Sequence, residues 1–113
     1  MKIILTGTPP STQHIYRHKG FRVYMTREGM DKKEQYQWEI KAQYKKSLIT
    51  KKFGLIMEFY FPDDRKRDLD NFNKLILDSG AGIAWEDDDL ISEMHLYKFV
   101  DKKNPRVELE IIT

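Results

Sequence analysis

The sequence predicts an α+β fold, a single small domain with a mixed β-sheet and two helices. Short segments alternate apolar and polar residues as strands do, whereas two other segments repeat apolar residues once per helical turn. The chain has 113 residues, which is close to the size of one domain, so residues 1–113 are taken as one unit. A core of this size is limited, and a homodimer would add buried apolar surface.

Five strands are predicted, and one of them is clearer than the others. Residues 2–7 read as a strand that the following prolines end, residues 8–20 as an irregular segment, and residues 21–25 as a second short strand. Residues 53–61 form the clearest strand, because every second side chain from Phe53 is large and apolar. Two further strands are expected at 91–100 and 106–112, joined as a hairpin through 102–105.

The two helices are predicted from apolar spacing. The long one covers 31–50, with Asp31 as its N-cap and Glu34 completing a capping box. The short one covers 69–79 and is closed by the glycines that follow it. The apolar positions of the long helix, one per turn, are Tyr36, Ile40, Tyr44 and Leu48.

Composition indicates a soluble, cytoplasmic protein. The chain has no cysteine, which excludes disulfides and thiolate metal sites, and we find no signal peptide and no apolar run that would span a membrane. Its net charge of +2 hides an asymmetry, since residues 63–93 hold ten acids and four bases. An acidic centre in a basic shell suits a metal-using enzyme that acts on a polyanion, although a solvated lysine-rich surface with one acidic loop has the same composition.

Two acidic clusters are the main indication of the chemistry. Asp68 and Asp70 stand where a loop enters the short helix, with Lys74 one turn after Asp70 and able to pair with it, and three consecutive aspartates follow at 87–89. Carboxylates that a fold gathers usually share a cation, and hard oxygen ligands beside a lysine suit Mg²⁺ or Mn²⁺ and phosphate chemistry. Helix capping, a surface ion pair and a solvated acidic turn are the structural alternatives. A calcium loop is excluded, because Phe72 and Asn73 occupy the places of a ligand and of the required glycine.

The same residues resemble a known family. The run Arg67-Asp68-Leu69-Asp70-Asn71-Phe72-Asn73-Lys74, the pair Leu77-Asp78 and the run Gly82-Ile83-Ala84-Trp85-Glu86-Asp87-Asp88 are similar to the motifs of the RusA family of Holliday-junction endonucleases. Pro9-Pro10-Ser11, Tyr16-Arg17 and Glu28-Gly29 look like its N-terminal signature, so the resemblance covers nearly the whole chain. It departs from the family at Leu90, where a polar residue is common, and at Thr12-Gln13-His14, where the family is Asn-rich.

The resemblance implies a RusA-like, homodimeric endodeoxyribonuclease that uses Mg²⁺, with Mn²⁺ as a substitute, and cuts two opposed strands of a four-way junction. It also implies a bacterial origin or a phage or prophage one, since the family is found in bacteria and their phages. Asp68, Asp70 and Asp88 would bind the metal, with Asp87 as the alternative to Asp88, and Lys74 would be essential for cleavage. No organic cofactor is expected. Two rivals stay open: a non-catalytic module that binds branched DNA, and a nuclease for flaps or forks.

Basic side chains in two loops are the candidate DNA contacts. A joint ligand role for His14 and His18 is disfavoured, because their segment does not read as helix. Phe21 is the best candidate for stacking on unpaired bases, although aromatic residues more often join a core, and Trp85 is read as a packing anchor for the acidic turn. The expected phosphate contacts are Arg17, Lys19, Arg22, Arg65, Lys66 and Arg67.

Overall fold

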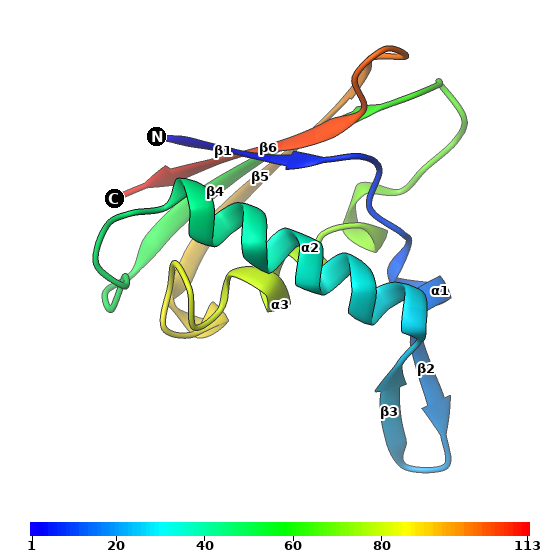
Figure 1. Ribbon diagram of the computed structural model, residues 1–113, viewed down its shortest axis with the longest axis horizontal. Coiled ribbons are helices and arrows are strands. Elements are labelled where there is room, and N and C mark those ends of the chain that lie inside the picture. Colours follow the sequence, from blue (N-terminus) through cyan, green and yellow to red (C-terminus); the bar gives the residue numbers. More distant parts are fainter.

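The computed structural model describes residues 1–113 and has the predicted α+β architecture with a mixed sheet. The four-stranded sheet has the order β1 (Lys2–Thr6), β6 (Arg106–Ile112), β4 (Phe53–Phe61) and β5 (Ile91–Val100) (Figure 1). β1 with β6 and β6 with β4 are antiparallel, whereas β4 and β5 are parallel. The parallel pair requires a crossover between β4 and β5, and both acidic clusters lie in that crossover.

Three α-helices are present where the sequence predicted two. They are α1 (Thr12–Ile15), α2 (Arg27–Gln43) and α3 (Lys74–Gly80), and two 3₁₀ turns accompany them, η1 (Leu69–Asn71) and η2 (Asp88–Leu90). The expected helix over 69–79 is therefore two pieces, η1 and α3. None of the helices has the length and apolar character needed to cross a bilayer.

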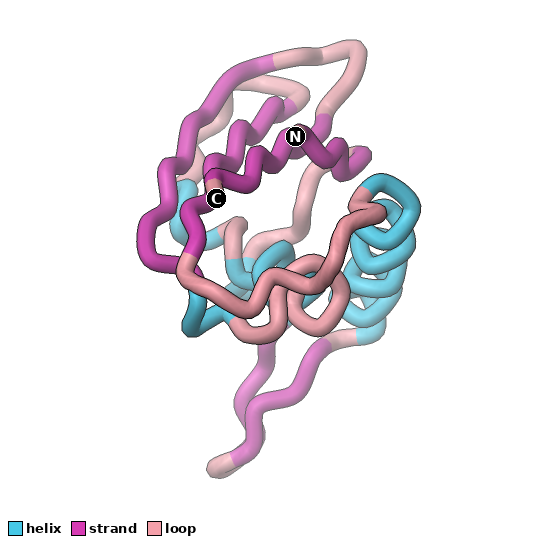
Figure 2. Tube along the Cα trace, turned by 90° about the vertical axis from the view of Figure 1, so that its left-hand side faces the viewer, coloured by secondary structure: helices cyan, strands magenta, loops and turns pink.

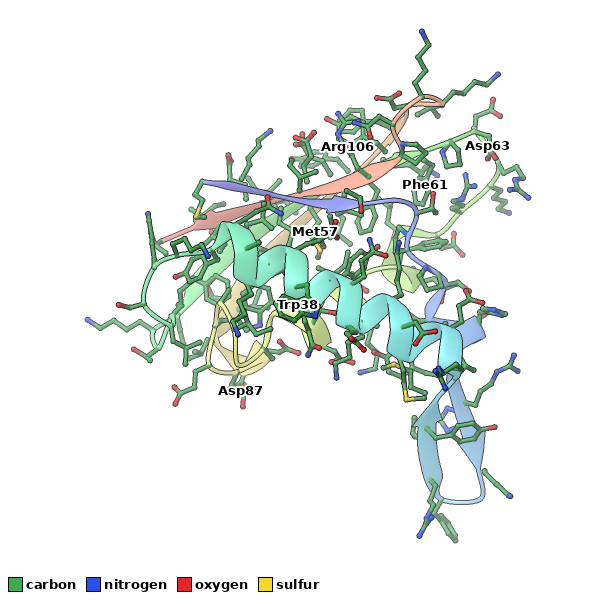
Figure 3. The ribbon with its side chains drawn as sticks, viewed as in Figure 1. Trp38, Met57, Phe61, Asp63, Asp87 and Arg106 are labelled. Carbon is green, nitrogen blue, oxygen red and sulfur yellow. The ribbon has the colours of Figure 1, made fainter.

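The helices cover one face of the sheet and leave the other face open (Figures 1 and 2). Alternate residues of β4 explain this, because Leu55, Met57 and Phe59 are fully buried whereas Ile56 and Glu58 between them are only partly covered. In Figure 3, Met57 lies between the sheet and α2. The buried face of β4 thus forms the centre of the hydrophobic core.

The long helix begins and ends earlier than predicted. Thr26 is the N-cap, since its side-chain oxygen accepts a hydrogen bond from the Gly29 amide at 3.2 Å, and the helix stops at Gln43. Asp31 instead forms an exposed ion pair with Arg27 on the outside of the first turns. Leu48, predicted as a buried helix position, lies in the loop after the helix and is 40% exposed. The predicted positions Tyr36, Ile40 and Tyr44 are buried, as expected.

The last two strands are not a hairpin. β4 lies between β5 and β6 and pairs with both, so the prediction of direct pairing was wrong. The physical reason is burial: β6 contributes Val107 and Leu109 to the core, which favours an inner place, whereas β5 is largely exposed and takes the edge.

Residues 16–25 form a separate two-stranded hairpin, of which only the second strand was predicted. β2 (Tyr16–Lys19) pairs with β3 (Arg22–Met25) through the two-residue loop Gly20-Phe21. Gly20 is the first residue of this turn and has φ +61°. Two-residue turns with a positive φ at this position match the twist of the two strands that they connect. Figures 1 and 2 show this hairpin projecting away from the rest of the molecule.

Candidate active site

Lys74, which ends the run from Arg67 to Lys74, lies against a tyrosine and an aspartate. Its Nζ is 3.6 Å from an Asp78 carboxylate oxygen, one turn along α3, and 4.9 Å from the centre of the Tyr16 ring. The Tyr16 hydroxyl donates a hydrogen bond to the same Asp78 oxygen. Because Tyr16 begins β2, these contacts place the root of the projecting hairpin beside the lysine.

The acidic turn after α3 is held by a buried tryptophan. Trp85 is fully buried, and its indole Nε1–H donates a hydrogen bond of 2.8 Å to the Asp88 carboxylate. Its ring lies on Gly80, where a Cβ would come within 2.2 Å of the indole, so only glycine fits there. The predicted packing role of Trp85 is confirmed, and the indole also orients Asp88.

The neighbouring Asp87 caps η2, accepting a hydrogen bond of 2.9 Å from the Asp89 amide, and its side chain is exposed. In Figure 3 it lies at the outer edge of the turn, away from α2.

Asp88 is the acid whose charge this neighbourhood disfavours. Partial burial raises the pKa of its carboxyl, and the negative charges of Asp78 and Asp87 raise it further, while the Trp85 hydrogen bond and Lys74 act in the opposite direction. Burial also raises the pKa of the Tyr16 phenol, together with its bond to Asp78 and the charge of Asp88. The site therefore holds an excess of negative charge that Lys74 compensates only in part, and it would be relieved by a cation.

The first acidic cluster stands apart from these contacts. Asp68 and Asp70 are exposed, and Asp68 makes no capping hydrogen bond with its side chain. The predicted pair of Asp70 with Lys74 is not formed, because Lys74 turns toward Asp78. Asn71, next to Asp70, accepts a hydrogen bond of 3.3 Å from the Gln13 amide, which links this turn to the segment before the hairpin.

The side chains in this arrangement do not form a metal site. Nowhere in the chain do three His, Cys, Asp or Glu side chains stand close enough together to hold a metal ion. Asp88 thus lies within electrostatic range of Lys74, but the structure does not gather Asp68, Asp70 and Asp88 into one ligand set. Their oxygen chemistry suits Mg²⁺, whereas their positions do not match its coordination.

The predicted DNA contacts fall in two places. Arg17, Lys19 and Arg22 are exposed on the hairpin, while Arg65 and Lys66 are exposed in the loop after β4. The sixth, Arg67, has partners within the chain: its guanidinium is 2.9 Å from Asp63 and lies over the Phe61 ring, and its side chain is only 11% exposed. Figure 3 shows Phe61 and Asp63 where β4 ends.

The histidines occupy different elements. His14, on α1, lies 3.1 Å from Glu28, and His18 is exposed on β2.

Sequence reasoning missed the roles of Tyr16 and Asp78. The sequence singles out both residues only as parts of motifs, Tyr16 in Tyr16-Arg17 and Asp78 in Leu77-Asp78. The Lys74–Asp78 spacing is i, i+4, the same as that of Asp70 and Lys74, so the pattern fitted either partner. Only the packing of the hairpin root against α3 distinguishes them, and no local pattern encodes that contact.

Comparison with known proteins agrees with these motifs. The family model described as endodeoxyribonuclease RusA matches residues 6–112. The chain is 31% identical over 105 residues to the crossover junction endodeoxyribonucleases RusA of Enterobacteria phage 82, Escherichia coli K12 and Shigella sonnei. Each of these alignments covers 91% of this chain and 87% of the relative.

Proposed function

Because this chain belongs to the RusA family and is an endodeoxyribonuclease, we propose that it resolves Holliday junctions by paired symmetric nicks in DNA recombination and repair. The observation that carries the proposal is the position of Lys74. It lies between acidic residues and the root of a basic hairpin, so a DNA strand held by the hairpin would pass beside it. The relatives named above are called crossover junction endodeoxyribonucleases, which supports the same substrate.

Lys74 supplies positive charge at the scissile phosphate. Its Nζ would offset the negative charge that develops on the phosphate oxygens as water attacks. Asp78 and Tyr16 act as positioning residues, because their contacts hold Lys74 and orient its charge. Hydrolysis would leave a 5′-phosphate and a 3′-hydroxyl, ends that a ligase joins.

A divalent metal is part of the proposal. Asp68, Asp70 and Asp88, with Asp87 as the alternative to Asp88, would hold Mg²⁺, or Mn²⁺ in its place, and the ion would supply Lewis-acid activation of water and phosphate. The support is the hard oxygen character of these side chains and the unrelieved negative charge around Asp88. Because the three carboxylates do not stand together here, the proposal requires the crossover to rearrange around the ion.

Two copies of the chain are needed for paired cuts, and β5 offers a surface for a homodimer. β5 is an edge strand of ten residues whose outer side no other strand covers. Long, exposed and apolar edges favour pairing with another chain. A second copy is the occupant we propose. The exposed apolar side chains of this strand are Met94, Tyr97, Phe99 and Val100, which are 41%, 49%, 41% and 52% exposed.

Other branched substrates, such as flaps and replication forks, are the main alternative for the same chemistry. The basic hairpin contacts backbone phosphates that every branched DNA shares, so its charge does not select one branch type. A non-catalytic module that binds branched DNA is the rival without chemistry.

The test is digestion of labelled four-way junction, fork and linear duplex by the wild-type chain and by Asp70→Asn, with Mg²⁺ or EDTA. We expect symmetric nicks in the junction that EDTA abolishes, and a loss of cleavage of at least about a hundredfold in Asp70→Asn with junction binding retained. Asp64→Asn is the matched control, because Asp64 is an exposed acid of the same loop outside the proposed site and should cut normally. Binding without cleavage by the wild type at any Mg²⁺ or Mn²⁺ concentration would favour the module.

A further inference from the structure

The tip of the β2–β3 hairpin carries an aromatic side chain with nothing around it. Phe21 has a relative exposure of 109%, the highest of the exposed large apolar residues, and follows Gly20 in the two-residue turn. A turn position normally takes a small polar residue, and a fully exposed phenyl ring has no role in the core. The ring is therefore free to make contact with a partner.

The face of the hairpin identifies the kind of partner. Cross-strand pairs share a face, and the pairs Arg17–Tyr24 and Lys19–Arg22 alternate with His18–Val23. One face therefore presents three cations around one tyrosine, and residues 16–25 contain no acid. Such a surface attracts a phosphate backbone, and an aromatic ring next to it can stack on a base.

The root of the hairpin fixes its relation to the site. Tyr16, the first residue of β2, contacts Lys74 and Asp78, while Phe21 is five residues further along an extended strand and its turn. At about 3.3 Å per residue the tip stands on the order of 15 Å from Tyr16. Phe21 can therefore touch a base without contacting the acids or the lysine.

We propose that Phe21 stacks on a base whose face is exposed at the branch point of DNA, and so contributes selectivity for branched over linear DNA. This inference rests on the proposed function and names a residue that would distinguish branched DNA from linear DNA. In a linear duplex every base is covered by its neighbours on both sides, whereas a branch point interrupts the stack. The three cations hold the backbone of either DNA, but only the branched one offers a free base to the ring.

The test measures binding by the full chain with Asp70→Asn in EDTA, so that no cleavage interferes. The parent is this Asp70→Asn chain, and three derivatives of it also carry Phe21→Ala, Phe21→Trp or Val23→Ala. For each protein, the affinity for a labelled four-way junction is compared at fixed salt with the affinity for a linear duplex that has the sequence of one arm. Val23 is the matched control, an apolar residue of the same hairpin that is 59% exposed on the other face. The fluorescence of 2-aminopurine at the branch reports stacking directly.

We expect Phe21→Ala to weaken junction binding by about 5-fold to about 150-fold, the range that loss of one stacked base gives, and to change duplex binding less than about twofold. Phe21→Trp should keep the junction binding of the parent, and Val23→Ala should resemble the parent. The parent should quench the fluorescence of 2-aminopurine, whereas the Phe21→Ala derivative should not. Equal losses on both DNAs, or no loss on the junction, would overturn the stacking role while leaving the proposed function in place. A parent without preference for the junction would instead contradict the proposed function and this inference together.

Discussion

Asp78 and Asp88 illustrate how single contacts set the charge balance of the site. Asp78 has two partners, the Tyr16 hydroxyl and the Lys74 ammonium, whereas Asp88 has only the Trp85 indole as a direct donor. Burial and like charges therefore disfavour the ionised form of Asp88. Carboxyls whose pKa is shifted by burial and by neighbouring charges are common in active sites.

Asp63 provides a prediction at this scale. Arg67 and then Arg65 lower the pKa of its carboxyl to about 2, below the ordinary value of 3.8. A lowered pKa in the folded state means that the stabilisation is present above the unfolded value and is lost as pH falls toward 2. Urea unfolding should thus show wild type more stable than Asp63→Asn at pH 6, with the difference fading between about pH 4 and about pH 2.

Asp64→Asn is the control for that series, because Asp64 is an exposed neighbour that forms no ion pair with Arg65 or Arg67. Its difference from wild type should stay small and should not follow the same pH course. A pH-independent Asp63→Asn difference would show that the Arg67 contact does not act through charge.

The sequence predicted an acidic partner for Lys74, but it indicated the wrong one. Of the acids in the two clusters, Asp88 is the one whose charge Lys74 influences, whereas Asp68 and Asp70 do not join it in one ligand set. The partner of Lys74 is Asp78 and not Asp70, because the choice between two carboxylates four residues away on either side depends on how Tyr16 packs on α3. Such a contact joins segments about sixty residues apart, and no local pattern contains it.

Among the elements, local patterns specified the strands of the main sheet and the long helix, but not which strands pair with each other. β4 and the core positions of α2 follow from apolar spacing, and both are as predicted. The place of β6 between β1 and β4 depends on whether β6 or β5 buries more apolar surface at an inner position, and this comparison involves the whole sheet. The hairpin strand β2 escaped prediction because its exposed, basic sequence lacks the apolar alternation that marks a strand.

The N-cap of α2 gives a prediction at the scale of the element. Thr26→Ala removes the side-chain oxygen that accepts from the Gly29 amide and should lower the free energy of unfolding by about 1 kcal/mol. Asp31→Ala, at the position that the sequence suggested as the cap, removes only an exposed ion pair and should cost less than about 0.5 kcal/mol. Urea denaturation of both variants would decide the matter, and the reverse order of costs would restore Asp31 as the cap.

For the whole molecule, the proposed dimer brings two sites to one junction. Tyr97→Lys places a charge on β5, where a lysine at an edge discourages strand pairing. We expect sedimentation to show a shift from dimer to monomer, and a plasmid with an extruded cruciform to give nicked circles in place of linear product. Tyr24→Lys, at a tyrosine of similar exposure on the hairpin, should leave the mass unchanged. A wild-type chain that sediments as a monomer at all concentrations would refute the dimer.

The parallel pairing of β4 and β5 also determines how the site can move. Both ends of the intervening segment are anchored in adjacent strands of the sheet, and every proposed metal ligand lies between these anchors. Closing the carboxylates around an ion would then require only the local opening of that segment, at a free energy below that of global unfolding. Amide hydrogen exchange in the segment should accordingly be faster than in β4, and slow down when a divalent ion is added.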